Sequence, residues 1–330
     1  MVALTDRVYL AGHRGLAGSA IGRALVRHGF SDVITRSRRQ LDLLDERAVA
    51  RFMSRKRPQI VILAAARVGG ILANSTRPAD FIAENLTIQS NVILNAFRYG
   101  VRKLVFLGSS CIYPRNASQP IREESLLTGP LETTNEFYAI AKIAGIKLCQ
   151  ALRAQHGFNA IALMPTNLYG CEDNFDERDS HVLAALLWRM HRARIEGAEE
   201  VVVWGSGRPR REFLHADDFA EALLTALLHY ESSAPINIGS GEDISIYELA
   251  EVIRKVVGYR GRFRFDESYP DGTPRKLLDI SRMASLGWRA KIPLETGLHR
   301  VYATLQRRWQ LEDATNDRLG INAERHRVAI

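Results

Sequence analysis

The sequence predicts an α/β fold in which a doubly wound parallel sheet carries a smaller C-terminal lobe. Through the first half of the 330-residue chain, short apolar runs alternate with stretches of helical periodicity. Near-continuous apolar strands separated by helices are typical of a parallel sheet that is covered on both faces. Beyond about Tyr169 this alternation loosens into loops punctuated by proline and glycine. The change in pattern predicts a second, smaller unit.

The expected elements follow one another along the chain in this order. The first five strands cover residues 8–11, 32–35, 60–63, 103–107 and 160–163, and the clearest helices cover residues 79–98 and 137–155. Shorter elements follow at 236–238, 246–257 and 262–265. We therefore expect a Rossmann domain over residues 1–170 and a mainly substrate-binding lobe over residues 171–330, with some later segments returning to the main sheet.

Composition narrows the possible partners. The formal net charge is +8, but the lysines and arginines are spread along the chain. Nucleic-acid binding would need a basic stripe with interleaved aromatic residues, which the sequence lacks, so the charge favours a small, multiply anionic ligand. Cys111, Cys149 and Cys171 have neither the spacing of metal ligands nor that of a disulfide framework. We expect free thiols and no metal site.

The N-terminus and the hydropathy pattern give an expectation for location. The first seven residues lead directly into a strand, and the longest apolar run, around residues 60–66, is only as long as a strand. A signal peptide and a membrane-spanning helix both need longer apolar stretches. We therefore expect a cytoplasmic protein that binds no membrane.

A glycine-rich loop lies between the first strand and a helical stretch at 19–27. Its glycines, Gly12, Gly15 and Gly18, have the spacing GxxGxxG, which is typical of short-chain and extended short-chain dehydrogenases. Glycines at such a turn let backbone amides approach a pyrophosphate at the helix N-terminus. The alternative is a structural turn, but the flanking strand and helix favour dinucleotide binding.

The end of the second strand indicates which dinucleotide binds. Residues 35–39 contain no carboxylate where an NAD enzyme usually binds the ribose 2′-hydroxyl. The guanidinium groups of Arg36 and Arg38, and of Arg14 in the glycine loop, suit a 2′-phosphate. We therefore predict NADPH rather than NADH, the alternative being a solvated basic turn.

Three residues indicate carbonyl reduction. Tyr138 and Lys142 lie one helical turn apart and share a helix face, so we expect the Lys142 ammonium to lower the pKa of the Tyr138 phenol. Ser109, at the end of the fourth strand, lies at the ligand edge of the sheet and can hydrogen-bond a substrate carbonyl. Tyr138 would then give that carbonyl a proton, with Lys142 on the nicotinamide ribose. The alternative for the pair is a solvated helix face.

Cys111 and His181 are candidates for a second chemistry. A Cys111 thiolate beside a sugar ketone could remove an α-proton, because the carbonyl stabilises the carbanion as an enolate. Reversal of the stereocentre then needs a proton donor on the opposite face, for which His181 is the candidate. Two alternatives stay open: a free cysteine is commonly a small buried hydrophobe, and a histidine at a helix start is commonly a cap or surface group.

Five longer strings contain these motifs and carry a family resemblance. They are Ala-Gly-His-Arg-Gly at 11–15, Gly-Ser-Ser-Cys-Ile-Tyr-Pro at 108–114, Tyr-Ala-Ile-Ala-Lys-Ile-Ala-Gly-Ile-Lys-Leu-Cys at 138–149, Met-Pro-Thr-Asn-Leu-Tyr-Gly at 164–170 and Pro-Asp-Gly-Thr-Pro-Arg-Lys-Leu-Leu-Asp at 270–279. In these strings the chain resembles the GDP-L-fucose synthases, a family of extended short-chain dehydrogenases. The resemblance implies NADPH-dependent conversion of GDP-4-keto-6-deoxy-D-mannose to GDP-L-fucose, by 3,5-epimerisation and then 4-keto reduction.

The resemblance also implies roles for individual residues. Ser109, Tyr138 and Lys142 would serve the reduction, and Cys111 and His181 would be the base and the acid of epimerisation. The implied cofactor-binding residues are Gly12, Arg14, Gly15, Gly18, Arg36, Arg38, Leu107, Ser109, Lys142, Pro165, Asn167, Leu168 and His181. The implied residues for the GDP-sugar are Asn167, Arg189, Trp204, Arg211 and Asp271. Two arginines and a tryptophan are also what a diphosphate and a guanine need.

Some departures and alternatives remain. Cys171 stands where the family pattern has a proline, and Arg67 stands where lysine is familiar. A GDP-L-colitose synthase and a 4-reductase without epimerisation are the nearest alternatives. A dehydratase is disfavoured because Ser110 and Cys111 occupy the place of its acid, and a non-catalytic NADPH-binding protein is disfavoured by the tyrosine and lysine pair. In the family the helices matching 79–98 and 137–155 pair across a two-fold axis, which implies a homodimer.

Overall fold

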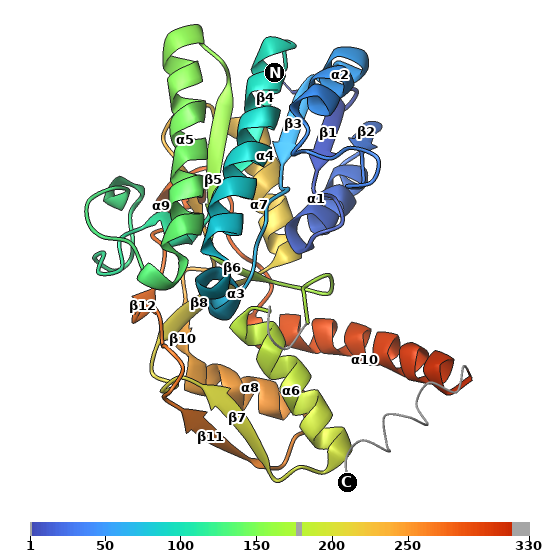
Figure 1. The fold of residues 1–330 in the computed structure, drawn as a ribbon, viewed down its shortest axis with the longest axis vertical. Helices are drawn as coiled ribbons and strands as arrows, with labels where there is room; N and C mark the ends of the chain where they lie inside the picture. Colours follow the sequence, from blue (N-terminus) through green and yellow to red (C-terminus); the bar gives the residue numbers. More distant parts are fainter. Residues whose placement is uncertain (1, 176–179, 319–330) are drawn as a thin grey trace.

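A six-stranded parallel sheet forms the centre of the larger lobe (Figure 1). The computed structural model describes residues 2–175 and 180–318. Across the sheet the strands are β2 (Asp32–Thr35), β1 (Arg7–Ala11), β3 (Ile60–Leu63), β4 (Lys103–Leu107), β5 (Ala160–Pro165) and β9 (Ile236–Ile238). Every neighbouring pair is parallel. The predicted doubly wound parallel sheet is confirmed, and the first five strands lie where the apolar runs predict them.

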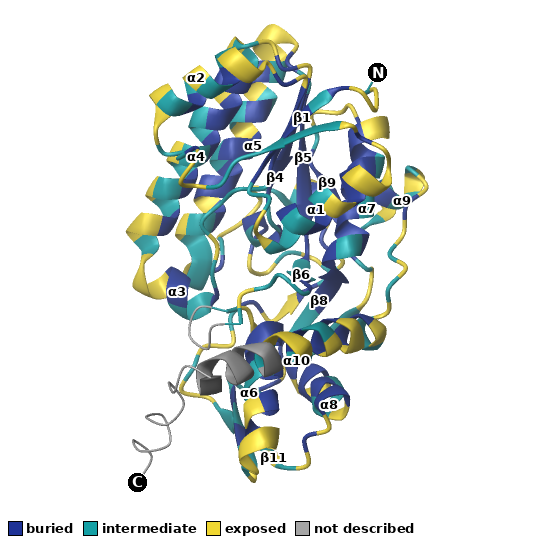
Figure 2. Ribbon diagram, turned by 90° about the vertical axis from the view of Figure 1, so that its right-hand side faces the viewer, coloured by how far each residue is buried: buried dark blue, intermediate teal, exposed yellow. Residues whose placement is uncertain are grey.

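Helices cover both faces of this sheet. On one face lie α1 (Leu16–Arg27) and α7 (Ala216–His229), and on the other α2 (Glu46–Lys56), α4 (Pro78–Arg98) and α5 (Glu136–His156). Successive side chains of a strand point to opposite faces, so Leu10 packs with α1 and α7 while Tyr9 packs with the other set. Both faces are therefore buried, as Figure 2 shows, and the strands are apolar throughout.

The strand order reverses between β1 and β3. From β1 the chain passes through α1 to β2 on one side, and then through α2 to β3 on the other side. At such a point the loops that follow the two strands diverge and leave a crevice in which ligands bind. The glycine loop after β1 lies at this crevice.

The smaller lobe is built around strands that leave the main sheet. Directly after β5, β6 (Asn167–Tyr169) pairs with β8 (Arg210–His215), which also pairs with β10 (Asp243–Ser245) and β12 (Arg275–Lys276). A separate parallel pair and three helices complete the lobe: β7 (Glu200–Trp204), β11 (Arg262–Asp266), α6 (Val182–Glu196), α8 (Ile246–Val257) and α10 (Leu294–Arg318). Short helices lie in the connections of both lobes: α3 (Ile71–Thr76) between β3 and α4, η1 (Ser110–Ile112), η2 (Glu123–Ser125) and η3 (Thr133–Asn135) between β4 and α5, and α9 (Ser281–Ser285) between β12 and α10.

Local signals set the helix ends. α8 begins at a capping box in which the Ser245 side chain accepts from the Glu248 amide and the Glu248 carboxylate accepts from the Ser245 amide. It ends at Gly258 in the left-handed conformation (φ 75°), the usual place for a glycine after a helix. Within the described ranges, none of the helices combines the length and apolar character needed to cross a membrane.

Candidate active site

A cavity of about 1030 Å³ lies where the two lobes meet. Its lining comes from the carboxyl ends of β1, β3 and β4, from β6 and α6, and from the segment that leads into β12. Every residue that the sequence analysis assigned to the cofactor, the substrate or catalysis lines this cavity. The fold therefore brings these residues together in one place, although they are spread from Gly12 to Asp271.

The glycines after β1 differ in their steric surroundings. Gly12 has a φ of +88°, and a Cβ on it would lie 2.6 Å from the Ala65 backbone nitrogen. A Cβ on Gly18 would lie 2.0 Å from the Gly12 carbonyl oxygen. A Cβ on Gly15 would meet only that same oxygen, at 3.6 Å, so this side of the loop is open. The loop thus turns tightly, packs closely on α1 and leaves a cradle beside Gly15.

The start of α1 can hold an anion in this cradle. The helix begins after Gly15, earlier than the predicted 19–27, and has neither a side-chain cap nor an acidic residue in its first turn. The amides of such a first turn lack helical partners and attract negative charge. Arg14, Arg36 and Arg38 line the same end of the cavity. A pyrophosphate and a 2′-phosphate both fit this donor set.

Ser109 connects the end of β4 with Tyr138. Its Oγ accepts from the Cys111 amide at 3.2 Å and the same side chain hydrogen-bonds the Tyr138 phenol. Burial raises the pKa of Tyr138 well above its usual value, the nearby Cys111 sulfur raises it further, and the bond to Ser109 offsets only part of the increase. Tyr138 therefore holds its proton at neutral pH.

Lys142 does not act on the phenol as expected. Its Nζ donates to the Leu107 carbonyl at 2.8 Å and lies 5.8 Å from the centroid of the Tyr138 ring. Burial lowers the pKa of Lys142 to about 8. The expectation that Lys142 lowers the pKa of Tyr138 is wrong in this structure, because the ammonium bonds a main-chain carbonyl and burial of the phenol dominates. A phenol that keeps its proton suits a proton donor.

The Cys111 sulfur lies among polar groups. Its Sγ is 3.4 Å from the Asn135 Nδ2 and 3.6 Å from the Lys276 Nζ. The residue is half-buried and lines the cavity. A cysteine that serves only as a small hydrophobe has apolar neighbours, so these contacts favour the reactive thiol.

His181 directly precedes α6 and faces the same cavity. In the described structure its side chain forms no hydrogen bond that caps the helix, which disfavours the capping alternative. The residue is exposed at its side of the open cavity, but the protein around it still lowers the pKa of His181 by desolvation, and the positive charge of Lys276 lowers it further.

The substrate end of the cavity lies in the smaller lobe and contains an unexpected stack. The Arg189 guanidinium carbon lies 4.1 Å from the Trp204 ring centroid, and the Tyr269 ring stacks on Trp204 with centroids 4.3 Å apart and planes 4° from parallel. Two groups this close to one ring must lie on its opposite faces. The face that the sequence analysis assigned to a guanine is therefore covered by Arg189 and Tyr269.

Asp271 and Asn167 are already engaged by protein groups. The Asp271 carboxylate accepts from the amide and the hydroxyl of Ser206, both at 2.7 Å, and the Asp271 carbonyl accepts from Arg211 at 3.1 Å. Asn167 donates to the Glu212 carbonyl at 2.8 Å. These contacts hold the walls of the cavity in place around any ligand.

Asn135, Tyr269 and Lys276 are cavity residues that the sequence analysis missed. Lys276 lies within the string at 270–279, but nothing in that string indicates that its side chain reaches Cys111, 165 positions earlier. For Tyr269 a signal was available, because this aromatic residue directly precedes the string at 270–279 that contains Asp271.

Comparisons with known proteins agree with this geometry. The model of the NAD dependent epimerase/dehydratase family matches residues 8–239. The chain is 56% identical over 308 residues to the probable GDP-L-fucose synthase 1 of Oryza sativa subsp. japonica, covering 93% of this chain and 92% of the relative. It is 53% identical over 317 residues to the GDP-L-fucose synthase of Escherichia coli strain K12, covering 93% and 97%.

More distant relatives are named for other sugars. The chain is 39% identical over 287 residues to a GDP-L-colitose synthase of Yersinia pseudotuberculosis, covering 86% of this chain and 93% of the relative. A solved structure, the GDP-mannoheptose C4 reductase from Campylobacter jejuni with NADP bound, superposes with a TM-score of 0.86 at 38% identity and covers 93% of this chain and all of its own. The chain therefore belongs to the NAD dependent epimerase/dehydratase family and, within it, to the family of the GDP-L-fucose synthases.

Proposed function

We propose that the protein converts GDP-4-keto-6-deoxy-D-mannose to GDP-L-fucose with NADPH. The observation that carries this proposal is the presence of two catalytic sets around one cavity. Ser109, Tyr138 and Lys142 provide carbonyl reduction, and Cys111 and His181 provide proton removal and return. The names of the most similar relatives and the NADP of the related reductase support the same reaction and cofactor.

The dinucleotide end of the cavity would hold NADPH. The first-turn amides of α1 would hold the pyrophosphate, and Arg14, Arg36 and Arg38 would hold the 2′-phosphate. Further lining residues would surround the nicotinamide half: Leu107, Lys142, Pro165, Asn167, Leu168 and His181. When bound, the cofactor supplies the hydride for the reduction.

The epimerisations precede the reduction. The Cys111 thiolate removes the proton at C3, and the electron pair of the C–H bond moves into the C4 carbonyl to form an enolate. Ser109 and Tyr138 donate hydrogen bonds to that oxygen and stabilise its charge. His181 returns a proton from the opposite face. Cys111 then loses its proton to solvent and His181 regains one from solvent, after which the same exchange follows at C5.

The reduction uses the same carbonyl. With both stereocentres inverted, the Tyr138 phenol gives its proton to the C4 oxygen as the carbon is reduced. The raised pKa of Tyr138 keeps this proton available throughout the preceding steps. Lys142, whose pKa is lowered to about 8, follows Tyr138 by one helix turn and would hold the nicotinamide ribose.

The GDP moiety would bind in the smaller lobe. Arg189 and Arg211 suit the diphosphate, since a guanidinium stays charged when it is buried. A guanine that stacks on Trp204 takes the place of Tyr269, which lies two residues before Asp271 in the segment between β11 and β12.

Solvent deuterium tests the function. The protein is incubated in D₂O with NADPH and GDP-4-keto-6-deoxy-D-mannose, and the product is identified by NMR. We expect GDP-L-fucose that carries deuterium at C3 and C5. A product without deuterium at either position would show a 4-reductase that does not epimerise, and preferential turnover of a 3-deoxy substrate would favour the colitose reaction instead.

We also propose a division at about residue 170, a homodimer and a cytoplasmic location. Exposed apolar side chains on α4 and α5, Leu94, Phe137 and Ile140, support pairing through these helices. Sedimentation at micromolar concentration tests the dimer, and a monomer there would contradict it.

A further inference from the structure

Lys276 is a buried cation that the proposed steps leave unused. Only 8% of the residue is exposed, and its Nζ lies 3.6 Å from the Cys111 sulfur. Its positive charge also acts on His181, whose pKa it helps to lower. One ammonium therefore contacts one of the two groups that we propose for epimerisation and acts electrostatically on the other.

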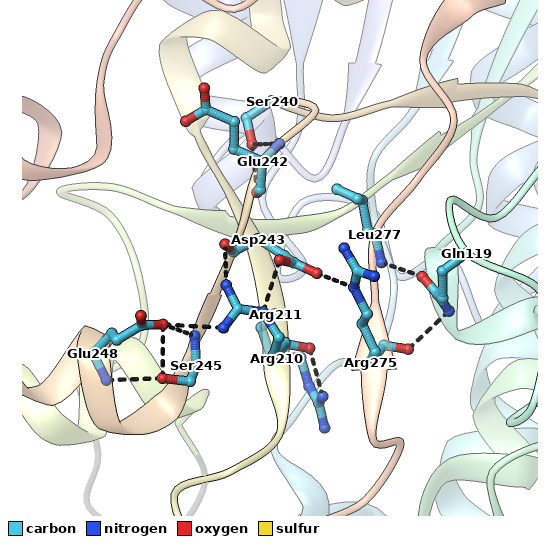
Figure 3. A network of polar contacts seen from close by, with 10 residues as sticks. All are labelled: Gln119, Arg210, Arg211, Ser240, Glu242, Asp243, Ser245, Glu248, Arg275 and Leu277. Atoms are coloured by element: carbon cyan, nitrogen blue, oxygen red, sulfur yellow. Dashed lines mark hydrogen bonds and ion pairs between the residues drawn. The ribbon is translucent and has the colours of Figure 1, made fainter.

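The backbone on both sides of Lys276 is fixed by one side chain. Figure 3 shows Gln119 between Arg275 and Leu277: its amide donates to the Arg275 carbonyl at 3.0 Å, and its Oε1 accepts from the Leu277 amide at 2.9 Å. The next amide, of Leu278, donates to the buried Glu212 carboxylate at 3.0 Å. Because these bonds fix the backbone of β12, less conformational entropy is lost when the lysine holds its ammonium at the sulfur.

We propose that Lys276 is a positioning residue for epimerisation, whose ammonium, together with the Asn135 amide, holds Cys111 as the thiolate that removes the sugar proton. An opposite charge within hydrogen-bond distance favours the ionised sulfur, and the thiolate is the reactive form. The same charge destabilises the imidazolium form of His181. A destabilised imidazolium is a stronger acid and gives up its proton more readily. The role of Lys276 in epimerisation rests on the proposed function. Its effect on the charge state of Cys111 can be tested without that function.

Other charged and titratable groups also face the sulfur. Arg211, paired with Lys276 across β8 and β12, interacts electrostatically with Cys111, as does Tyr138 from α5. Glu132 and Asp271 act on Arg211 in turn. Lys276 differs from these groups because its charged atom is within contact distance of the sulfur and because the proposed mechanism gives it no other task.

The charge state is measured first. The ultraviolet absorbance of the thiolate is followed against pH, as the difference between each protein and its Cys111→Ser counterpart. We expect Lys276→Met to raise the midpoint of thiolate formation by about one pH unit and Lys276→Arg to restore it. Lys291→Met, which removes one exposed lysine, is the matched control and leaves the midpoint unchanged. An unchanged midpoint in folded Lys276→Met protein overturns the proposal, whatever reaction the enzyme catalyses.

The catalytic consequence is measured separately. At neutral pH, Lys276→Met should take up deuterium at C3 and C5 about tenfold more slowly, and the rate should recover when the pH is raised by about one unit, because the thiolate fraction follows the midpoint. NADPH oxidation with the already epimerised keto sugar should keep its rate. Equal losses in both assays, without pH recovery, would show a general structural role and overturn the proposal. Absence of deuterium uptake in the unaltered enzyme would instead contradict the proposed function.

Discussion

At the scale of residues, charge decides which cofactor the protein uses. Arg38 is exposed at the end of β2 and lines the cavity, so its substitution should leave the fold intact. In Arg38→Asp the carboxylate repels a 2′-phosphate and can accept from a 2′-hydroxyl. We expect the ratio of kcat/KM for NADPH to that for NADH to fall at least tenfold. The exposed Arg39 is not part of the lining, so Arg39→Asp is the matched control, and an unchanged preference in Arg38→Asp would contradict the assignment.

Lys142 should make stability depend on pH. Its pKa is about 8 in the folded protein and 10.5 when exposed, so the unfolded chain binds more protons between these values. The contribution of Lys142 to the free energy of unfolding therefore rises by on the order of 3 kcal/mol as the pH rises from about 8 to about 10.5. Denaturant unfolding of the protein and of Lys142→Met should show a difference in stability that changes by this amount over that range. A constant difference between the two proteins would contradict the shifted pKa.

The residues that could be predicted from the sequence are those whose relation is local. The spacing of Tyr138 and Lys142 places both on one helix face, and the position of Ser109 after a strand places it at the ligand edge of a parallel sheet. Lys276 and Tyr269 reach Cys111 and Trp204 only through the pairing of strands in the smaller lobe. The pKa of Tyr138 could not be predicted either, because burial of the phenol depends on the packing of the whole site.

At the scale of elements, two glycines of the loop after β1 should have different roles: Gly18 allows the chain to fold, and Gly15 leaves room for the cofactor. A methyl group on Gly18 would lie 2.0 Å from the Gly12 carbonyl oxygen, whereas one on Gly15 enters the open cradle, and Gly15 has ordinary extended dihedrals. We expect Gly18→Ala to lower the melting temperature by several degrees, because backbone must move. Gly15→Ala should keep the melting temperature and bind NADPH at least tenfold more weakly in a fluorescence titration. Equal NADPH affinity in Gly15→Ala and the unaltered protein would show that the pyrophosphate lies elsewhere.

The strands and helices that the sequence predicts well are those with a strong local pattern. The strands of the main sheet are short, apolar on both faces and bounded by loops, and α4 and α5 are long. α7 was not predicted, because it packs between elements on most of its surface and its apolar residues give little helical periodicity: Ala216, Phe219, Ala220, Ala222, Leu223, Leu224, Ala226 and Leu227 are all buried.

At the scale of the whole molecule, the chain crosses between the lobes several times. After β6 and β8 contribute to the smaller lobe, α7 and β9 return to the main sheet. The cavity depends on this arrangement, since β4 and α5 position Ser109, Tyr138 and Lys142 while the start of α6 and β12 bring His181 and Lys276 to them. Sequence patterns identify the parts of such a molecule but not these crossings, because strand pairing between distant segments of the chain leaves no local signal.

The most direct test of the account is the fate of solvent deuterium in Cys111→Ser and Tyr138→Phe, each assayed in D₂O with NADPH and the keto sugar. In our account one cavity holds a single carbonyl that serves both reactions. We therefore expect that Cys111→Ser no longer introduces deuterium at C3 and C5 of the product but still oxidises NADPH. Tyr138→Phe should lose reduction by a factor of at least 100 and still exchange protons. Undiminished deuterium at both positions in Cys111→Ser, with GDP-L-fucose still formed, would contradict the account.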